Sequence, residues 1–179
     1  MLNEIIGLIV DTAATIFAAA FLLRFWTQAV RVRPPDPIAR FIFKASNWLV
    51  MPLRRILPGS GYDWASLIGA MLVAVIAVLP ALWMTPHLNP KFVALIAIQQ
   101  FLNWVFYGFM GLLVLEALFS WMNPQAPIAP FVAALNEPIL RPIRRVIPPL
   151  GGLDLTVLIA LVALRVILML LHWTLVSLL

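Results

Sequence analysis

Four ionisable residues lie inside long apolar stretches of this sequence, where a charge needs a partner or water. They are Asp11, Arg24, Glu116 and Arg165. A charge buried in hydrocarbon costs on the order of 3 kcal/mol or more, so such side chains usually have a structural or functional role. They either pair across helices and hold them together, or they line a hydrated path for ions or protons. These two kinds of chemistry are the ones that this sequence can support.

Enzymatic and metal-binding patterns are absent from the sequence. It contains no cysteine, which excludes disulfides and thiolate nucleophiles. Its two histidines, His87 and His172, have no neighbouring carboxylate cluster to complete a metal site. There is no Ser-His-Asp arrangement, no glycine-rich phosphate loop and no carboxylate pair spaced for acid–base work. We therefore expect no enzyme activity, no catalytic residue, no cofactor and no metal.

The composition indicates that lipid surrounds most of the chain. Of 179 residues, 64% are hydrophobic and only 11% are charged. A soluble domain of this length could not bury so much apolar surface. Basic residues give a net charge of +5, but they stand beside the apolar stretches, where they act as topology signals. Nucleic acid is therefore not an expected partner.

The first half of the chain predicts two membrane spans, at about residues 2–29 and 64–84. Between them, residues at about 37–51 alternate apolar and polar positions with helical spacing, which is typical of an amphipathic helix on the membrane surface. Asp36 before Pro37 is a suitable N-cap for this helix, and Pro52 is expected to end it. Asp63 is the expected N-cap of the second span.

The second half repeats this pattern. The segment P-L-R-R-I-L-P at 52–58 returns as P-I-R-R-V-I-P at 142–148, ninety positions later, and Asp154 follows it as Asp63 follows the first copy. Spans are expected at about 91–121 and 154–177, with an interfacial segment at about 130–147 and Asp154 as N-cap. The chain is therefore expected to be a duplication with units at 1–88 and 89–179.

Charge placement predicts the topology. Nine basic residues lie in the two connectors, whereas only Lys91 lies on the opposite side. The positive-inside rule then places both connectors in the cytoplasm and both termini outside. We expect an all-α integral membrane protein with four transmembrane helices in two parallel tandem repeats. Each repeat has a cytoplasmic amphipathic interfacial helix between its two spans, and the location is a bacterial-type plasma (inner) membrane.

The duplicated segment resembles the YggT family, also called YlmG, of small bacterial and plastid membrane proteins with two such repeats. The resemblance rests on Asp36-Pro37, the segment 52–58 and Asp63, and on Glu137-Pro138, the segment 142–148 and Asp154. It covers nearly the whole chain. One departure is that Arg24 of the first copy aligns with Glu116 of the second. The resemblance implies an accessory factor linked to cell division, nucleoid or membrane organisation, osmotic tolerance or membrane-complex assembly, and it brings no catalytic residues.

Two groupings of the intramembrane polar residues are expected. Arg24 and Glu116 each lie about five residues before the cytoplasmic end of a span, at a similar depth, which favours an ion pair between them. The alternative is that Arg24 extends to the interface while Glu116 is protonated or meets another subunit. Further out, a polar cluster is expected to line a cavity or to provide interhelical hydrogen bonds. Its members are Asp11, Gln99, Asn103 and Arg165.

Basic side chains of the connectors are candidate contacts for anionic lipid headgroups or an acidic partner, and they also fit a simple role as topology anchors. They are Arg40, Lys44, Arg54, Arg55, Arg144 and Arg145. A homo-oligomer or a larger membrane-protein complex is compatible with this picture. Two functions remain: a non-catalytic scaffold or assembly factor, and an ion channel or regulator of ion transport that uses Glu116 and Asp11. The small number of polar residues in the spans favours the scaffold.

Overall fold

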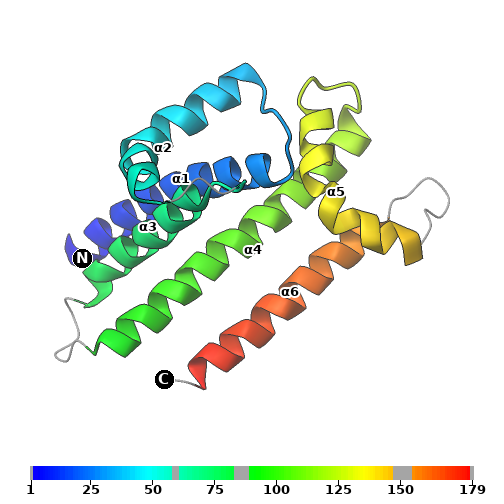
Figure 1. The fold of residues 1–179 in the computed structure, drawn as a ribbon. Coiled ribbons are helices and arrows are strands. Elements are labelled where there is room, and N and C mark those ends of the chain that lie inside the picture. Colours follow the sequence, from blue (N-terminus) through cyan, green and yellow to red (C-terminus); the bar gives the residue numbers. More distant parts are fainter. Residues whose placement is uncertain (1, 58–60, 83–88, 147–154, 178–179) are drawn as a thin grey trace.

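The computed structural model describes residues 2–57, 61–82, 89–146 and 155–177, and these residues form six α-helices (Figure 1). The helices are α1 (Leu2–Ala29), α2 (Asp36–Ile56), α3 (Trp64–Leu82), α4 (Pro90–Met122), α5 (Ala129–Val146) and α6 (Leu155–Val176). No strand occurs among the described residues, so the expectation of an all-helical protein is confirmed for them.

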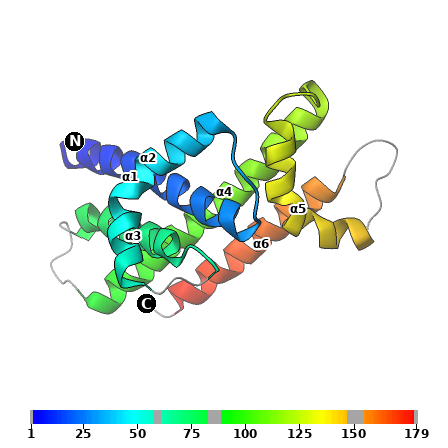
Figure 2. The ribbon, with the colours of Figure 1, turned by 45° about the horizontal axis from the view of Figure 1, so that its top comes forward.

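The six helices form two units of three, with a connector helix between two apolar helices in each. The start of α1 and the end of α6 lie at one end of the molecule, and α2 and α5 lie at the other (Figure 1). The turned view shows α2 lying across α1 and α3, and α5 lying across α4 and α6 (Figure 2). Both connector helices therefore cover the same end of the apolar helices.

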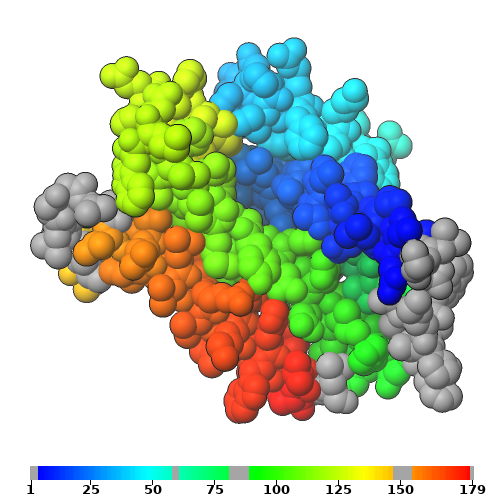
Figure 3. All heavy atoms as spheres, turned by 180° about the vertical axis from the view of Figure 1, so that it is seen from behind, coloured from blue at the N-terminus to red at the C-terminus, as the bar shows by residue number. Residues whose placement is uncertain are grey.

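Three helices are long and apolar enough to cross a bilayer: α1 from Glu4 onward, α4 and α6. The predicted second span corresponds to α3, which has 19 residues and no charged side chain but is shorter than the other three. On the face shown in Figure 3, α4 lies between α1 and α6. Large apolar side chains of these helices are exposed, as expected for a surface that faces lipid. Examples are Ile9, Ile16, Leu118, Val166 and Leu170.

The first connector helix, α2, is longer than the sequence pattern predicted. We expected α2 to end before Pro52, but it continues through this proline to Ile56. The second connector helix, α5, likewise continues through Pro138 and Pro142. A proline removes one backbone hydrogen bond and bends a helix without necessarily ending it, and both helices change direction in Figure 1. The Arg-Arg pairs are therefore the last turns of helices rather than parts of loops.

The three predicted N-caps have different outcomes. Pro35 holds the N-cap position of α2, and Asp36 is the first helical residue without a side-chain cap, so the prediction is wrong by one position. Asp63 directly precedes α3, and its carbonyl accepts a hydrogen bond from the amide of Ser66 at 2.9 Å. This is the position expected of a cap. Asp154 lies outside the described residues.

A left-handed residue ends α1 and turns the chain toward α2. Arg31 has φ of 59°, and the amide of Val32 donates to the carbonyl of Thr27 at 2.9 Å. The amide of Arg31 donates to the carbonyl of Gln28 at 3.1 Å. Together these bonds are the pattern of a Schellman motif, which satisfies carbonyl groups at the end of a helix. The turn places Arg31 and Arg33 beside the end of α1.

Two hydrophobic clusters explain how the units are built and joined. In the first unit, small residues such as Ala14, Ala18 and Ala70 let α1 and α3 approach closely around the buried ring of Phe21. Between the units, Leu135 on α5 packs with Trp26 on α1. The indole Nε1 of Trp26 donates to the carbonyl of Leu135 at 2.9 Å. The connector helix of the second unit is thus attached to the first span of the first unit.

Candidate functional site: two charged clusters and a basic pocket

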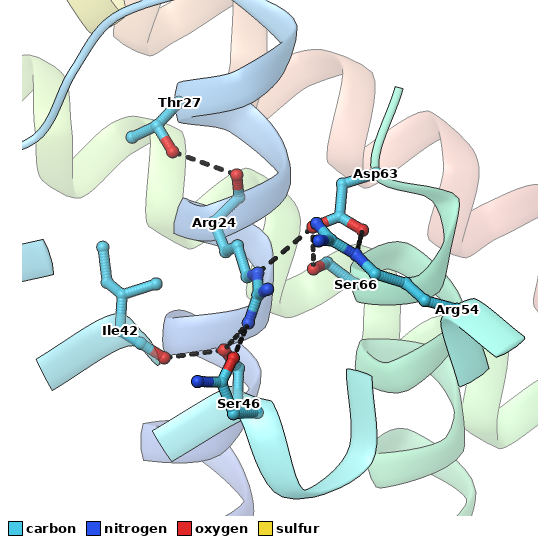
Figure 4. Close-up of polar contacts among 8 residues, drawn as sticks. Arg24, Thr27, Ile42, Ser46, Arg54, Asp63 and Ser66 are labelled. Carbon is cyan, nitrogen blue, oxygen red and sulfur yellow. Dashed lines mark hydrogen bonds and ion pairs between the residues drawn. The ribbon is translucent and has the colours of Figure 1, made fainter. Parts of the chain in front are cut away.

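The first charged cluster joins all three helices of the first unit around Asp63 (Figure 4). Arg24 on α1 donates from Nε to Oδ2 of Asp63 at 3.1 Å. Arg54 on α2 reaches the same carboxylate through two bonds, Nη2 to Oδ2 at 2.7 Å and Nε to Oδ1 at 3.2 Å. Ser66, in the first turn of α3, donates its hydroxyl to Oδ2 at 2.8 Å. One carboxylate therefore binds two guanidinium groups.

Arg24 is the centre of this cluster because it is almost fully buried. Only 6% of the residue is exposed, and Nη1 donates to Oγ of Ser46 at 2.7 Å and to Oδ1 of Asn47 at 2.8 Å. The guanidinium carbon also lies 5.0 Å from the centre of the Phe43 ring, within the range of a cation–π contact. These contacts let an arginine occupy an otherwise apolar helix. Arg24 thereby ties α1 to α2 as well as to Asp63.

Asp63 is held in its charged form. Burial alone raises the pKa of its carboxyl group. The hydrogen bonds from Arg54 and Ser66, together with the charges of Arg54 and Arg24, outweigh burial and bring the pKa below its ordinary value. The side chain is only 1% exposed, whereas that of Arg54 is 49% exposed. The carboxylate therefore depends on these contacts more than Arg54 does.

The second unit contains a matching cluster around Glu116 on α4. Oε2 of Glu116 accepts a hydrogen bond from Nδ2 of Asn136 at 2.8 Å. Its other oxygen accepts from Nη2 of Arg144 at 3.1 Å, and both contacts come from α5. Arg144 also contacts Glu137 at 3.2 Å. As in the first unit, a charged residue of an apolar helix is bound by the connector helix that follows it.

The two clusters use equivalent positions with reversed charge. Asn136 stands ninety positions after Ser46, and Arg144 stands ninety positions after Arg54. Arg24 contacts Ser46 in the first unit, and Glu116 contacts Asn136 in the second. These contacts support the alignment of Arg24 with Glu116 that the repeat suggested.

The predicted ion pair between Arg24 and Glu116 is wrong, because the structure gives each residue other partners. Arg24 binds Asp63, and Glu116 binds Arg144. The prediction compared the depths of the two residues along their own helices. It did not consider that each connector helix folds back over its own unit and offers polar groups there. The matched spacing of Ser46 and Asn136 was the signal in the sequence that could have shown this.

The predicted polar cluster in the outer half is also wrong in its membership. Oδ1 of Asp11 accepts from Nε2 of Gln100 at 3.2 Å, one residue beyond the predicted Gln99. Arg165 donates from Nη1 to the hydroxyl of Tyr107 at 2.8 Å. Oδ1 of the predicted Asn103 is buried without a hydrogen-bond partner among the described residues. Adjacent residues of a helix differ by about 100° in direction, so Gln100 rather than Gln99 meets Asp11. Asp11 and Arg165 therefore take part in two separate interhelical hydrogen bonds instead of one cluster.

The candidate lipid contacts fall into two groups. Arg54 and Arg144 turn inward to the charged clusters. The other four candidates are exposed on the connector helices and remain available to a headgroup or a partner. They are Arg40, Lys44, Arg55 and Arg145. In each Arg-Arg pair, the first arginine therefore contacts the carboxylate of a charged cluster, and the second is exposed on the connector helix.

A pocket of about 560 Å³ lies beside the first cluster, between the end of α1, the α1–α2 connector and α2. Four of its lining residues are arginines, and none is acidic. The lining consists of Arg24, Thr27, Gln28, Arg31, Val32, Arg33, Pro34, Ile42, Phe43 and Arg54. Arg31 and Arg33 belong to the nine connector residues whose charge predicts the topology, and no pattern in the sequence predicts a pocket around them. Within residues 2–57, 61–82, 89–146 and 155–177, no group of three or more His, Asp or Glu side chains could hold a metal ion.

Comparison with known proteins agrees with the internal repeat. The family model described as CCB3/YggT matches the chain twice, at residues 3–84 and 95–175. Each match covers one of the three-helix units. No solved structure matches the chain.

Several curated bacterial proteins are similar to the chain over most of their length. An uncharacterized protein of Pseudomonas aeruginosa is 34% identical over 176 residues, which covers 93% of this chain and 87% of that protein. An uncharacterized protein encoded in the proC 3′ region of Vibrio alginolyticus is 30% identical, with 88% of each chain covered. The uncharacterized protein YggT of Escherichia coli K12 is 30% identical, with 89% of this chain and 85% of that protein covered.

Proposed function

Because this chain belongs to the CCB3/YggT family, whose model it matches twice, we propose that it is a non-catalytic scaffold or assembly factor of a bacterial-type plasma membrane. In this proposal its work is to present two firmly held connector helices to lipids or to a membrane-protein partner. Cell division, membrane organisation and osmotic tolerance are the processes in which such a factor would serve.

The observation that supports the proposal is that the charged residues of the apolar helices contact the connector helices. Arg24 and Glu116 both bind the connector helix of their own unit. A buried charge with such contacts fixes one geometry, since breaking the contacts leaves a charge without a partner in an apolar region. The clusters therefore hold α2 and α5 rigidly across the ends of the other helices. A rigid, basic surface of this kind suits a scaffold.

Membrane placement belongs to the same proposal. The helix α3 is 19 residues long, which corresponds to about 28 Å and is close to the thickness of a bilayer core. With α3 as a fourth span, α1, α3, α4 and α6 cross the membrane in two parallel repeats. The positive-inside rule then puts α2 and α5 on the cytoplasmic side and both termini outside.

Exposed basic side chains would provide the contact surface. Arg55 and Arg145 occupy equivalent positions and are exposed, while Arg40 and Lys44 extend the same character along α2. Guanidinium groups at headgroup depth bind phosphate and carboxylate well. Anionic lipids and an acidic segment of a membrane-protein partner are the contacts expected of this surface. Ion conduction, the competing function, would instead require a hydrated path through the spans.

Site-specific photocrosslinking in bacterial membranes tests the proposal. A photoreactive amino acid at Arg55 or Arg145 should give discrete protein adducts, and the same amino acid at the exposed α3 residue Ile76 is the matched control. The purified chain in liposomes should show no potassium or proton flux above that of empty liposomes. Flux that changes in the Glu116→Gln variant would overturn the proposal in favour of ion conduction.

A further inference from the structure

The basic pocket of the first unit contains more positive charge than its surroundings neutralise. Arg24 and Arg54 share the single carboxylate of Asp63. Arg31 and Arg33 form no ion pair with any residue that the structure describes. Four arginines therefore face one pocket, with one carboxylate behind them. A concentration of cations around a hollow favours the entry of an anion.

The geometry of the pocket suits a phosphate group. Arg24 lies at the buried side and Arg54 is half exposed, while Arg31 and Arg33 are exposed at the connector. Several guanidinium groups around one hollow can bind the oxygens of a phosphate through paired hydrogen bonds. The Schellman motif at the end of α1 satisfies carbonyl groups that would otherwise repel an anion there.

Four of the six other lining residues are apolar, which favours a lipid headgroup over a free anion. Val32, Pro34, Ile42 and Phe43 line the same pocket. Its volume of about 560 Å³ is larger than inorganic phosphate needs. A phosphodiester attached to glycerol and acyl chains would place its phosphate on the arginines and its apolar part against these side chains. Arg24 lies five residues before the end of α1, about 8 Å inside it, which is a reasonable depth for this contact.

The second unit provides an internal comparison. The position of Arg24 is taken by Glu116, and the position of Phe43, ninety residues on, is Ala133. Its connector, residues 121–128, reads W-M-N-P-Q-A-P-I and contains no basic residue. The arginines that line the pocket at the α1–α2 connector therefore have no counterparts at the equivalent positions of the second unit.

From these observations we infer that the pocket formed by Arg24, Arg31, Arg33, Arg54 and Phe43 is a binding site for the phosphate of an anionic phospholipid. The inference rests on the proposed membrane orientation, because that orientation places the pocket at the headgroup layer. It does not depend on the scaffold role, since a lipid site would serve any membrane protein.

Native mass spectrometry of the purified full chain in detergent, titrated with phosphatidylglycerol or phosphatidylcholine, tests the inference. We expect phosphatidylglycerol to bind at least about tenfold more tightly than phosphatidylcholine. The double variant Arg31→Gln with Arg33→Gln should lose about tenfold or more of that affinity. The matched control is Lys91→Gln with Arg141→Gln, which removes the same charge from exposed positions of α4 and α5 outside the pocket. It should lose less than about twofold.

Three outcomes would overturn the inference. Equal binding of the two lipids would show that charge is not recognised. Equal losses in the two double variants would show a general electrostatic attraction without a site. Displacement of phosphatidylglycerol by inorganic phosphate at the same concentration would assign the pocket to a free anion. Unchanged unfolding temperatures of both variants show that the fold is intact, and crosslinks from Arg55 and Arg145 would report on the scaffold role separately.

Discussion

In each unit of this protein, one charged residue of an apolar helix is bound by the connector helix, and this residue is positive in the first unit and negative in the second. In the first unit, Arg24 and Arg54 share the carboxylate of Asp63. In the second, Arg144 contacts the carboxylates of Glu116 and Glu137. In both units a polar bridge joins the connector helix to the preceding apolar helix, whereas the sign of the bridging charge on that apolar helix differs.

The sign of the bridging charge also changes the charge beside each connector. The arrangement in the first unit adds positive charge beside the α1–α2 connector, which already holds Arg31 and Arg33. The arrangement in the second unit adds negative charge beside a connector without basic residues. The same arrangement of helices can therefore surround a pocket with arginines in one unit without doing so in the other.

The largest effect should come from removing the shared carboxylate of the first unit. Asp63→Asn keeps the shape of the side chain but leaves Arg24 and Arg54 facing each other without a counter-charge. Breaking a buried ion pair in this way costs about 3–5 kcal/mol. We expect a loss of this size in the free energy of unfolding, measured by denaturant titration in detergent micelles. A loss below about 1 kcal/mol would contradict the importance given to this cluster.

Acid should weaken the first cluster in a way that the Asp63→Asn variant does not share. The pKa of Asp63 is lowered in the folded protein. The stability that it contributes is therefore complete above the ordinary aspartate pKa of about 3.9 and is lost as the pH falls through the folded value. The advantage of the wild type over Asp63→Asn should be constant between about pH 5 and 7 and shrink below about pH 4. An advantage that persists unchanged at pH 3 would contradict this.

A smaller effect is expected in the second unit. Its central carboxylate is more exposed than that of the first, with 13% exposure for the Glu116 side chain against 1% for Asp63. Arg144 is 35% exposed, so water can replace part of the contact. Glu116→Gln should lower the free energy of unfolding by about 1–2 kcal/mol. Glu137→Gln is the control, because Glu137 is 52% exposed, and it should cost less than about 0.5 kcal/mol. Equal losses in the two variants would contradict the ranking.

Much of the fold follows from local patterns in the sequence. Apolar stretches of helical length, the amphipathic spacing of the connector helices and the repeat of the proline–arginine segment predicted helices close to those observed. The ends of α2 were less predictable. Whether Pro52 bends or ends a helix depends on what the residues after it pack against, and that is decided by α3 and Asp63 rather than by the proline itself.

The partners of the charged residues were harder to predict than the helices. A charge inside an apolar stretch can be recognised from the sequence, and this is how Arg24 and Glu116 were identified as residues that need partners. The neighbour that supplies the partner depends on how the connector helix folds back, which a periodic pattern does not encode. Asp63 illustrates the difficulty, because a residue at the start of a helix was interpreted as a cap, whereas its carboxylate binds Arg24, Arg54 and Ser66.

Arg24 and Glu116 are each bound by partners of their own unit, and a pair of double-mutant cycles can test this arrangement. One cycle combines Arg24→Gln with Asp63→Asn, and the other combines Arg24→Gln with Glu116→Gln, each followed by the free energy of unfolding in the same micelles. We expect a coupling energy of about 1–3 kcal/mol between Arg24 and Asp63 and a coupling within about 0.5 kcal/mol of zero between Arg24 and Glu116. A strong coupling between Arg24 and Glu116, with none between Arg24 and Asp63, would contradict this arrangement.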